Sequence, residues 1–321
     1  MNKNLFPGVP RVESPLFASD PLDDLTESEQ QVARDLHSKG YAVLDFPDPQ
    51  INERIERIQD NLGPRYDIPF DDPNADKTQG ERRIQDAWTF DEDVRAIASN
   101  PQILALLAKL YGREAFPFQT LNFPVGTQQG SHSDSVHFSS LPERFMCGVW
   151  LAMEDVQQSA GPLFYYPGSH SWPIINNSMI GRRGFGSELE SAQDPFEEAW
   201  SALCETHQAK KETFLAKKGQ ALIWTANLLH GGSAQTDPRL TRWSQVTHYY
   251  FADCIYYTPA YSDETLGQLD IRELVSAVDG KPRPNTYMGE RIEKRDLLPK
   301  PNKEGYPSAI SAVLGKMGLK L

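Results

Sequence analysis

The chain has 321 residues, of which 39% are hydrophobic and 10% aromatic, enough to bury one substantial core. Its formal net charge of −12 argues against nonspecific nucleic-acid binding, because phosphate affinity needs a basic face. No run approaches the roughly 18 apolar residues of a membrane span, and residues 1–4 do not begin a signal peptide. The three cysteines have no paired spacing, as expected of reduced thiols. We therefore expect a cytoplasmic protein with no membrane segment and one domain over residues 1–321.

Helices and short strands alternate in the lead-in, about residues 20–112, which follows an extended arm rich in Pro and Asp. Thr26-Glu27-Ser28-Glu29 predicts a capping box, and the helix that it opens runs to about Ser38 and stops at Gly40. The next expected elements are a strand over 41–46, an amphipathic helix over about 51–62, a polar loop over 71–80, and a helix that Asn100-Pro101 begins and Gly112 ends. We expect these helices to cover the outside of a β-structured core.

Strands dominate the core, about residues 115–251, so the fold class is mainly β with flanking helices. The expected strands lie over 116–123, 145–153, 162–166, 221–224 and 241–251. Asp194-Pro195 opens a helix that reaches about Lys210. A C-terminal extension over 252–321 either folds over the core or mediates a homodimer, and the sequence leaves both alternatives open.

Two histidines and one aspartate form a candidate metal site. His132 and Asp134 stand two positions apart, so on a strand both side chains point to the same face. A third ligand, His230, follows the predicted buried strand 221–224. Two imidazoles and one carboxylate that leave other metal positions open make the facial triad of non-heme Fe(II) oxygenases. The alternative is that His132 and Asp134 are solvated surface groups near a loop.

An arginine on the last core strand is a candidate anion anchor. Strand alternation over 241–251 puts Arg242 and Ser244 on one face, together with Val246 and His248. The guanidinium fork matches a carboxylate bidentately, and a nearby hydroxyl adds a further hydrogen bond, which suits the distal carboxylate of 2-oxoglutarate. Arg239 competes for this role, although Asp237-Pro238 places it in the preceding turn.

Four motifs in this order resemble the phytanoyl-CoA dioxygenase family of Fe(II)- and 2-oxoglutarate-dependent oxygenases. They are Gly130-Ser131-His132-Ser133-Asp134, the run Gly161-Pro162-Leu163-Phe164-Tyr165-Tyr166-Pro167-Gly168-Ser169-His170-Ser171-Trp172, Leu229-His230-Gly231-Gly232-Ser233 and Arg242-Trp243-Ser244. The resemblance implies a double-stranded β-helix, or cupin-like jelly roll, that holds Fe(II) through His132, Asp134 and His230. It also implies that 2-oxoglutarate chelates the iron and is anchored by Arg242. The spacing from His230 to Arg242, 242 minus 230, is one longer than the family pattern, and we place the extra residue in a turn at Gly231-Gly232.

The chemistry implied by the resemblance is a dioxygenase reaction. O2 and 2-oxoglutarate are consumed, succinate and CO2 are released, and hydrogen is abstracted from a C–H bond of a small-molecule substrate. Related halogenases replace the carboxylate ligand with a small residue to admit chloride. Asp134 therefore indicates a hydroxylase or another hydrogen-abstracting enzyme.

Further site residues are less strongly indicated. Gln119 lies where the family places an amide that hydrogen-bonds the cosubstrate, and the alternative is a solvent-facing position on its strand. The residues that could contact substrate are His137, Trp172 and the pair Arg182 and Arg183, which could clamp a carboxylate, phosphate or sulfate. For each of these a purely structural position is the alternative. His170 is expected to be structural.

Two other classes of protein stay open. One is a cupin-like metalloenzyme, a hydrolase or isomerase, for which Arg242 and Ser244 would have no obvious task. The other is a noncatalytic jelly roll that binds a ligand, which an intact His132, Asp134 and His230 set disfavours.

Overall fold

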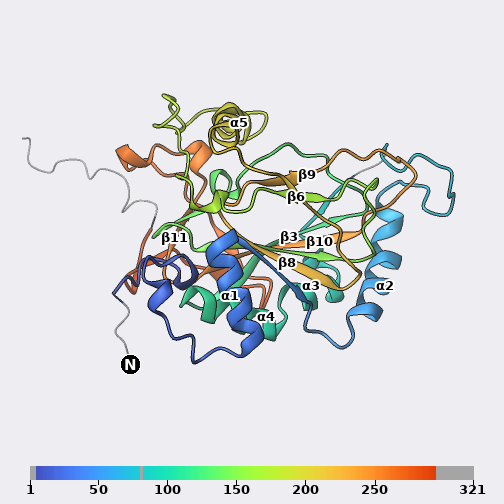
Figure 1. The fold of residues 1–321 in the computed structure, drawn as a ribbon, viewed down its shortest axis with the longest axis horizontal. Coiled ribbons are helices and arrows are strands. Elements are labelled where there is room, and N and C mark those ends of the chain that lie inside the picture. Colours follow the sequence, from blue (N-terminus) through green and yellow to red (C-terminus); the bar gives the residue numbers. More distant parts are fainter. Residues whose placement is uncertain (1–4, 80–81, 294–321) are drawn as a thin grey trace, which may run out of the picture.

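Two antiparallel sheets face each other in the computed structural model, which describes residues 5–79 and 82–293 (Figure 1). The six-stranded sheet has the order β1-β8-β5-β10-β3-β2, and the three-stranded sheet has the order β7-β6-β9. The strands of the larger sheet are β1 (Tyr41–Asp45), β2 (Ile84–Gln85), β3 (Ala115–Phe123), β5 (Met146–Ala152), β8 (Gln220–Thr225) and β10 (Ser244–Phe251). Those of the smaller sheet are β6 (Leu163–Tyr165), β7 (Glu212–Phe214) and β9 (His230–Gly232). The predicted mainly β, jelly-roll fold is confirmed.

Four helices cover the outer face of the six-stranded sheet, and α5 (Glu197–Thr206) lies on the opposite side of the molecule (Figure 1). The four are α1 (Glu27–Lys39), α2 (Ile51–Leu62), α3 (Glu92–Ala98) and α4 (Pro101–Tyr111). The predicted capping box of α1 is present, with reciprocal hydrogen bonds between Thr26 and Glu29, and Gly40 ends the helix in the left-handed conformation. The longest helix among the described residues has 13 residues, so none of them could cross a membrane.

The six-stranded sheet is buried on both faces, which explains its continuous apolar runs. On β5, Val149 and Leu151 pack against the helices, whereas Trp150 and Ala152 point between the two sheets. On β8, Ile223 belongs to the outer cluster and its neighbours to the inner one. The space between the sheets is therefore a second core, and side chains from both sheets line a cavity there.

Three local features differ from the sequence predictions. Residues 11–19 form two short 3-10 turns rather than an extended arm, because Val12 is fully buried and Phe17 stacks on the ring of His37. The helix expected from Asp194 begins with a 3-10 turn and is regular only over α5. The strand expected from Thr241 begins at Ser244, because the backbone N–H of Arg242 donates to Pro124 outside the sheet.

The described part of the C-terminal extension packs on the core. Within it, β11 (Ile255–Tyr257) pairs with β4 (Ser139–Leu141), and Arg95 of α3 donates to the carbonyl of Ala277. Short pairs follow, β12 (Leu274–Val275) with β13 (Pro282–Arg283) and β14 (Thr286–Tyr287) with β15 (Glu290–Arg291). Residues 294–321 lie outside the described residues, and the homodimer stays a prediction.

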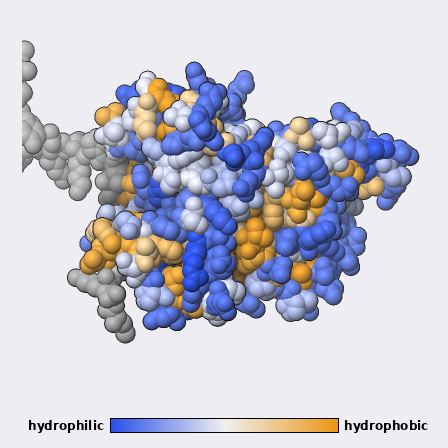
Figure 2. Space-filling view, viewed as in Figure 1, coloured by the Kyte–Doolittle hydropathy of each residue, from blue (hydrophilic) through white to orange (hydrophobic). Residues whose placement is uncertain are grey.

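The face of the molecule in Figure 2 is mostly hydrophilic, and its apolar side chains form separate groups rather than one continuous patch. This agrees with a chain in which the long apolar runs are already used inside, between the sheets and under the helices.

Asn100 offers a test of the predicted start of α4. Its side chain accepts hydrogen bonds from the N–H groups of Gln102 and Ile103 and donates one to the carbonyl of Pro47. We expect Asn100→Ala to lower the free energy of unfolding by about 1–2 kcal/mol, because the helix loses its cap. Urea unfolding measures this change. Asn100→Asp, which keeps the accepting oxygen, should lose less, and equal unfolding midpoints for the alanine variant and the unchanged protein would contradict the assignment.

Candidate functional site

The two histidines of the predicted triad are joined by their backbones. The N–H of His132 donates to the carbonyl of His230 at 2.9 Å, and the N–H of His230 returns the bond at 3.0 Å. This is a single antiparallel bridge rather than the strand expected around His132, because Ser133 caps a 3-10 turn that begins at Asp134. The side chains of His132 and Asp134 nevertheless reach the same point. His230 is the first residue of β9, and its neighbours Gly231 and Gly232 lie in this strand rather than in the expected turn.

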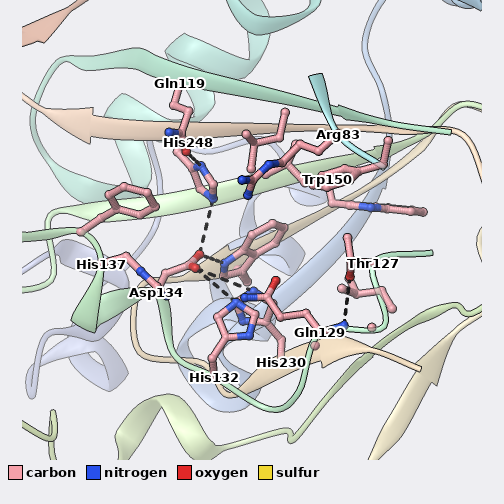
Figure 3. Close-up of a pocket in the computed structure, with 18 of the residues that line it drawn as sticks. Arg83, Gln119, Thr127, Gln129, His132, Asp134, His137, Trp150, His230 and His248 are labelled. Atoms are coloured by element: carbon pink, nitrogen blue, oxygen red, sulfur yellow. Dashed lines mark hydrogen bonds and ion pairs between the residues drawn. The ribbon is translucent and has the colours of Figure 1, made fainter. Parts of the chain in front are cut away.

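The ligand atoms of His132, Asp134 and His230 all lie within 4.8 Å of one another, and all three residues are buried (Figure 3). Each histidine places its Nδ1 at 3.0 Å from a backbone carbonyl, that of Gly130 for His132 and that of Leu228 for His230. A carbonyl can only accept, so each Nδ1 carries the proton and each Nε2 presents a lone pair. The two Nε2 atoms lie 3.7 and 3.9 Å from Oδ1 of Asp134, so all three donors face one small space.

Electrostatics favour a cation in this space. Burial and the neighbouring His230 together lower the pKa of His132 to about 3, against the opposing effect of Asp134. His132 is thus a neutral ligand at neutral pH. Burial alone would raise the pKa of Asp134, but His230, His248 and His132 hold it well below its usual range. The carboxylate therefore stays charged in a buried position, which is costly unless a positive charge lies beside it.

Arg242 lies at the other end of the same cavity. It is 2% exposed, its guanidinium lies over the ring of Trp150 at 5.6 Å, and burial lowers its pKa to about 10, so it remains protonated at neutral pH. Its Nε and the buried Oγ of Ser244 have no hydrogen-bond partner among the described residues. Such unpaired groups cost free energy unless a ligand satisfies them. An anion with several acceptor oxygens fits this pair.

Arg239, the alternative anchor, points away from the cavity. Its guanidinium is paired with Asp237 at 2.7 Å, and its side chain is 56% exposed. The structure therefore favours Arg242 over Arg239 as the buried cation, as the turn at Asp237-Pro238 suggested.

The cavity that holds these groups has a volume of about 270 Å³ and opens between the two sheets. Two further predicted residues line it. Gln119 on β3 accepts a hydrogen bond through Oε1 from Nδ1 of His248 at 3.0 Å, and His137 follows the 3-10 turn of Asp134. Side chains that the sequence reasoning did not single out also line the cavity: Arg83, Gln85, Leu121, Phe123, Thr127, Gln129, Phe138, Trp150, Leu163 and Trp224.

Three predicted substrate residues do not line this cavity. Arg182 bonds the side chains of Asn177 and Ser187 and the carbonyl of Ala260, and Arg183 bonds Asp263 and Gln268. Both guanidinium groups therefore fasten the segment after residue 172 to the C-terminal extension. Trp172 stacks on His207 with ring centroids 4.6 Å apart. None of the three is among the residues that line the described cavity, because their side chains are engaged in packing and hydrogen bonds elsewhere.

Residues around the triad fix its position. Asn227 donates to the carbonyls of His170 and Trp172 and accepts from the hydroxyl of Ser133, which stands between two of the ligands. His170 itself hydrogen-bonds the carbonyl of His37 through Nε2 and lies outside the metal cluster, in the structural role expected of it. The indole of Trp224 donates to Oδ2 of Asp134 at 2.7 Å. Only its place in an apolar run was visible in the sequence, and that run reads as core.

Comparisons with known proteins were made on sequence and on fold. The family described as Phytanoyl-CoA dioxygenase (PhyH) matches residues 31–242, more than half of the chain. No curated protein matches the chain significantly in sequence.

Among solved structures, the carbocyclase SnoK from nogalamycin biosynthesis superposes with a TM-score of 0.55 at 17% identity, over 78% of this chain and 94% of its own. EctD from S. alaskensis with 2-oxoglutarate and 5-hydroxyectoine gives 0.54 at 19% identity, over 90% and 95%. The epimerase SnoN with Fe3+, alpha ketoglutarate and nogalamycin RO gives 0.52 at 18% identity, over 84% and 97%. At these identities the likeness concerns the fold. By the match of its sequence over residues 31–242, the chain belongs to the phytanoyl-CoA dioxygenase family of iron- and 2-oxoglutarate-dependent oxygenases.

Proposed function

We propose that this protein is a dioxygenase that hydroxylates an unactivated C–H bond of a small molecule and releases succinate and CO2. The observation that carries the proposal is the pairing of two sites in one cavity. The buried cluster of His132, Asp134 and His230 can bind a cation, and the buried Arg242 can bind an anion in the same cavity. A metal and a dicarboxylate that bridges from the metal to the arginine would satisfy both.

The donor set fits Fe(II). Two neutral imidazoles and one carboxylate are the ligands of the non-heme iron oxygenases, and three ligands from one side leave positions for a chelating 2-oxoacid and for O2. Fe(II) and 2-oxoglutarate together supply the oxidant that removes a hydrogen atom from the substrate. Similar proteins of this fold have been crystallised with Fe3+ and alpha ketoglutarate or with 2-oxoglutarate, which supports these cofactors.

The residues of the chain have separate tasks in this proposal. His132 and His230 bind the metal through Nε2, because their Nδ1 protons are held by backbone carbonyls. Arg242 and Ser244 bind the distal carboxylate of 2-oxoglutarate, and the ring of Trp150 keeps the guanidinium in place. Gln119 and His137 line the cavity where the substrate and cosubstrate would meet.

The balance of charge supports a dianionic cosubstrate. Asp134 contributes one negative charge, whereas Arg242 and Arg83, which both line the cavity, are basic, so a bound divalent cation would leave an excess of positive charge there. A doubly charged 2-oxoglutarate would offset this excess. A hydrolase or isomerase that binds only a metal would leave Arg242 buried without a counter-ion in the cavity, which is costly.

Hydroxylation is the outcome favoured by the ligand set. Asp134 occupies the position that a halogenase would leave open for chloride, and its carboxylate is held by hydrogen bonds. Similar folds include an epimerase and a carbocyclase, so other outcomes of hydrogen abstraction are the second candidate. The substrate is a small molecule, in keeping with a cavity of about 270 Å³ that the cosubstrate must share.

The metal and cosubstrate assignment predicts a visible absorption band. Protein mixed with Fe(II) under anaerobic conditions should develop the charge-transfer band of a chelated 2-oxoacid when 2-oxoglutarate is added. His132→Ala and His230→Ala should abolish the band, because each removes one of the three ligands. A band that survives in either variant, or never forms with the unchanged protein, would show that the metal site lies elsewhere.

The anchor assignment predicts different effects for two neighbouring arginines. Arg242→Ala should raise the KM for 2-oxoglutarate in uncoupled succinate formation by about 10- to 100-fold, since charge-assisted hydrogen bonds worth about 1.5–3 kcal/mol are lost. Arg239→Ala is the matched control and should change this KM by less than about twofold, because its exposed ion pair with Asp237 contributes little. The reverse pattern would assign the anchor to Arg239.

A further inference from the structure

We propose that Trp224 is a positioning residue that turns Asp134 so that only one carboxylate oxygen can reach the metal. This inference rests on the proposed function, because it assumes that His132, Asp134 and His230 bind a metal ion. It assigns a role to a side chain that belongs to no ligand motif and lies on a different strand from all three ligands.

The two oxygens of Asp134 have different surroundings. Oδ1 faces the Nε2 atoms of His132 and His230, at 3.7 and 3.9 Å. Oδ2 accepts the hydrogen bond from the indole Nε1 of Trp224 at 2.7 Å, and Nε2 of His248 lies 3.6 Å from it. The oxygen next to the two imidazoles is therefore the ligand atom, and the other is already engaged by the protein.

The indole ring of Trp224 fits into a space that a glycine on the neighbouring strand leaves free. Trp224 on β8 is paired in register with Gly148 on β5, and it is 3% exposed. A Cβ atom at Gly148 would lie only 2.2–2.8 Å from atoms of the indole ring, so any larger residue would displace it. The ring also lies against His230, with centroids 4.9 Å apart. Trp224 thus touches two of the three ligands and cannot easily turn away.

Holding one oxygen has a chemical consequence. Carboxylates bind metals through one oxygen or through both, and the second mode uses an additional coordination position. The cosubstrate and O2 need all the positions that three protein ligands leave open. Because the N–H of Trp224 occupies Oδ2, Asp134 is restricted to the first mode. A hydrogen bond from a neutral donor to a buried carboxylate also offsets part of the cost of burying its charge.

The test replaces the indole N–H and measures metal binding directly. In Trp224→Phe the aromatic ring remains but the donor is lost, and titration with Co(II), a spectroscopic substitute for Fe(II), follows both affinity and coordination. We expect the affinity for Co(II) to fall by about 10- to 100-fold, as is usual when a group that orients a metal ligand is removed. The visible spectrum of bound Co(II) should also change, since the freed Oδ2 can join the coordination sphere. Gly148→Ala, which displaces the indole, should move both quantities in the same direction.

Trp200→Phe is the matched control. Trp200 is a buried tryptophan of α5 that packs in a different hydrophobic cluster and does not line the cavity, so this change carries the same kind of packing loss without touching Asp134. Its Co(II) affinity and spectrum should equal those of the unchanged protein. An unaltered spectrum and an affinity within twofold in Trp224→Phe would overturn the inference. If the unchanged protein binds Co(II) no better than His132→Ala does, the proposed function fails instead.

Discussion

The active site depends on the reciprocal pair of backbone hydrogen bonds between His132 and His230. These residues are 98 positions apart, 230 minus 132, and the backbone pair brings their imidazole rings to a centroid distance of 4.5 Å. Once the backbones are joined, carbonyls two residues away orient each ring, and both Nε2 atoms face Asp134. Backbone pairing of this kind is indifferent to the side chains, so the fold itself sets the position of the candidate metal ligands. A bound metal ion would then balance the charge of the ionised and buried Asp134.

The two ends of the cavity hold buried groups of opposite charge. Asp134 and Arg242 have opposite charges in one cavity, yet no ion pair joins them in the structure. Asp134 is surrounded by three imidazoles and an indole N–H, whereas the charge of Arg242 is moderated by Glu154 and by the ring of Trp150. The Nε of Arg242 has no hydrogen-bond partner among the described residues, and Oδ1 of Asp134 faces the two imidazoles. A cation at one end and a carboxylate at the other relieve both, and a single chelating dicarboxylate can connect them.

Local patterns were enough to predict several elements of the fold, and the three predicted metal ligands lie together in the structure. The capping box at Thr26, the start of α4 after Asn100 and the buried strand at β8 each depend on a few neighbouring residues, and each is present. The two-residue spacing of His132 and Asp134 also brings their side chains together, although a 3-10 turn replaces the expected strand.

The contacts that the sequence did not reveal depend on the register between distant strands. The hydrogen bond from Trp224 to Asp134 spans 90 positions, and an apolar run with a tryptophan reads as core whether or not its N–H has a partner. Arg182 and Arg183 show the opposite case, since two arginines among glycines predict a flexible clamp until their partners Asn177 and Asp263 are known.

The engagement of Arg182 and Arg183 changes where substrate selection should be sought. Asn177 donates to three carbonyls of residues 259–262, and Asp263 binds Arg183 and the backbone N–H of Gly184, so the segment after Trp172 and the C-terminal extension form one wall. The polar side chains of that wall are hydrogen-bonded to one another and do not line the cavity.

The polar side chains that do line the cavity come from the edge of the six-stranded sheet and from the loop before the candidate metal ligands. They are Arg83, Gln85, Gln119, Thr127 and Gln129. Because β2 is an edge strand of only two residues that pairs with β3 alone, its side chains can vary without disturbing the ligands. In this chain we therefore expect substrate contacts at this edge, apart from the bridge between His132 and His230.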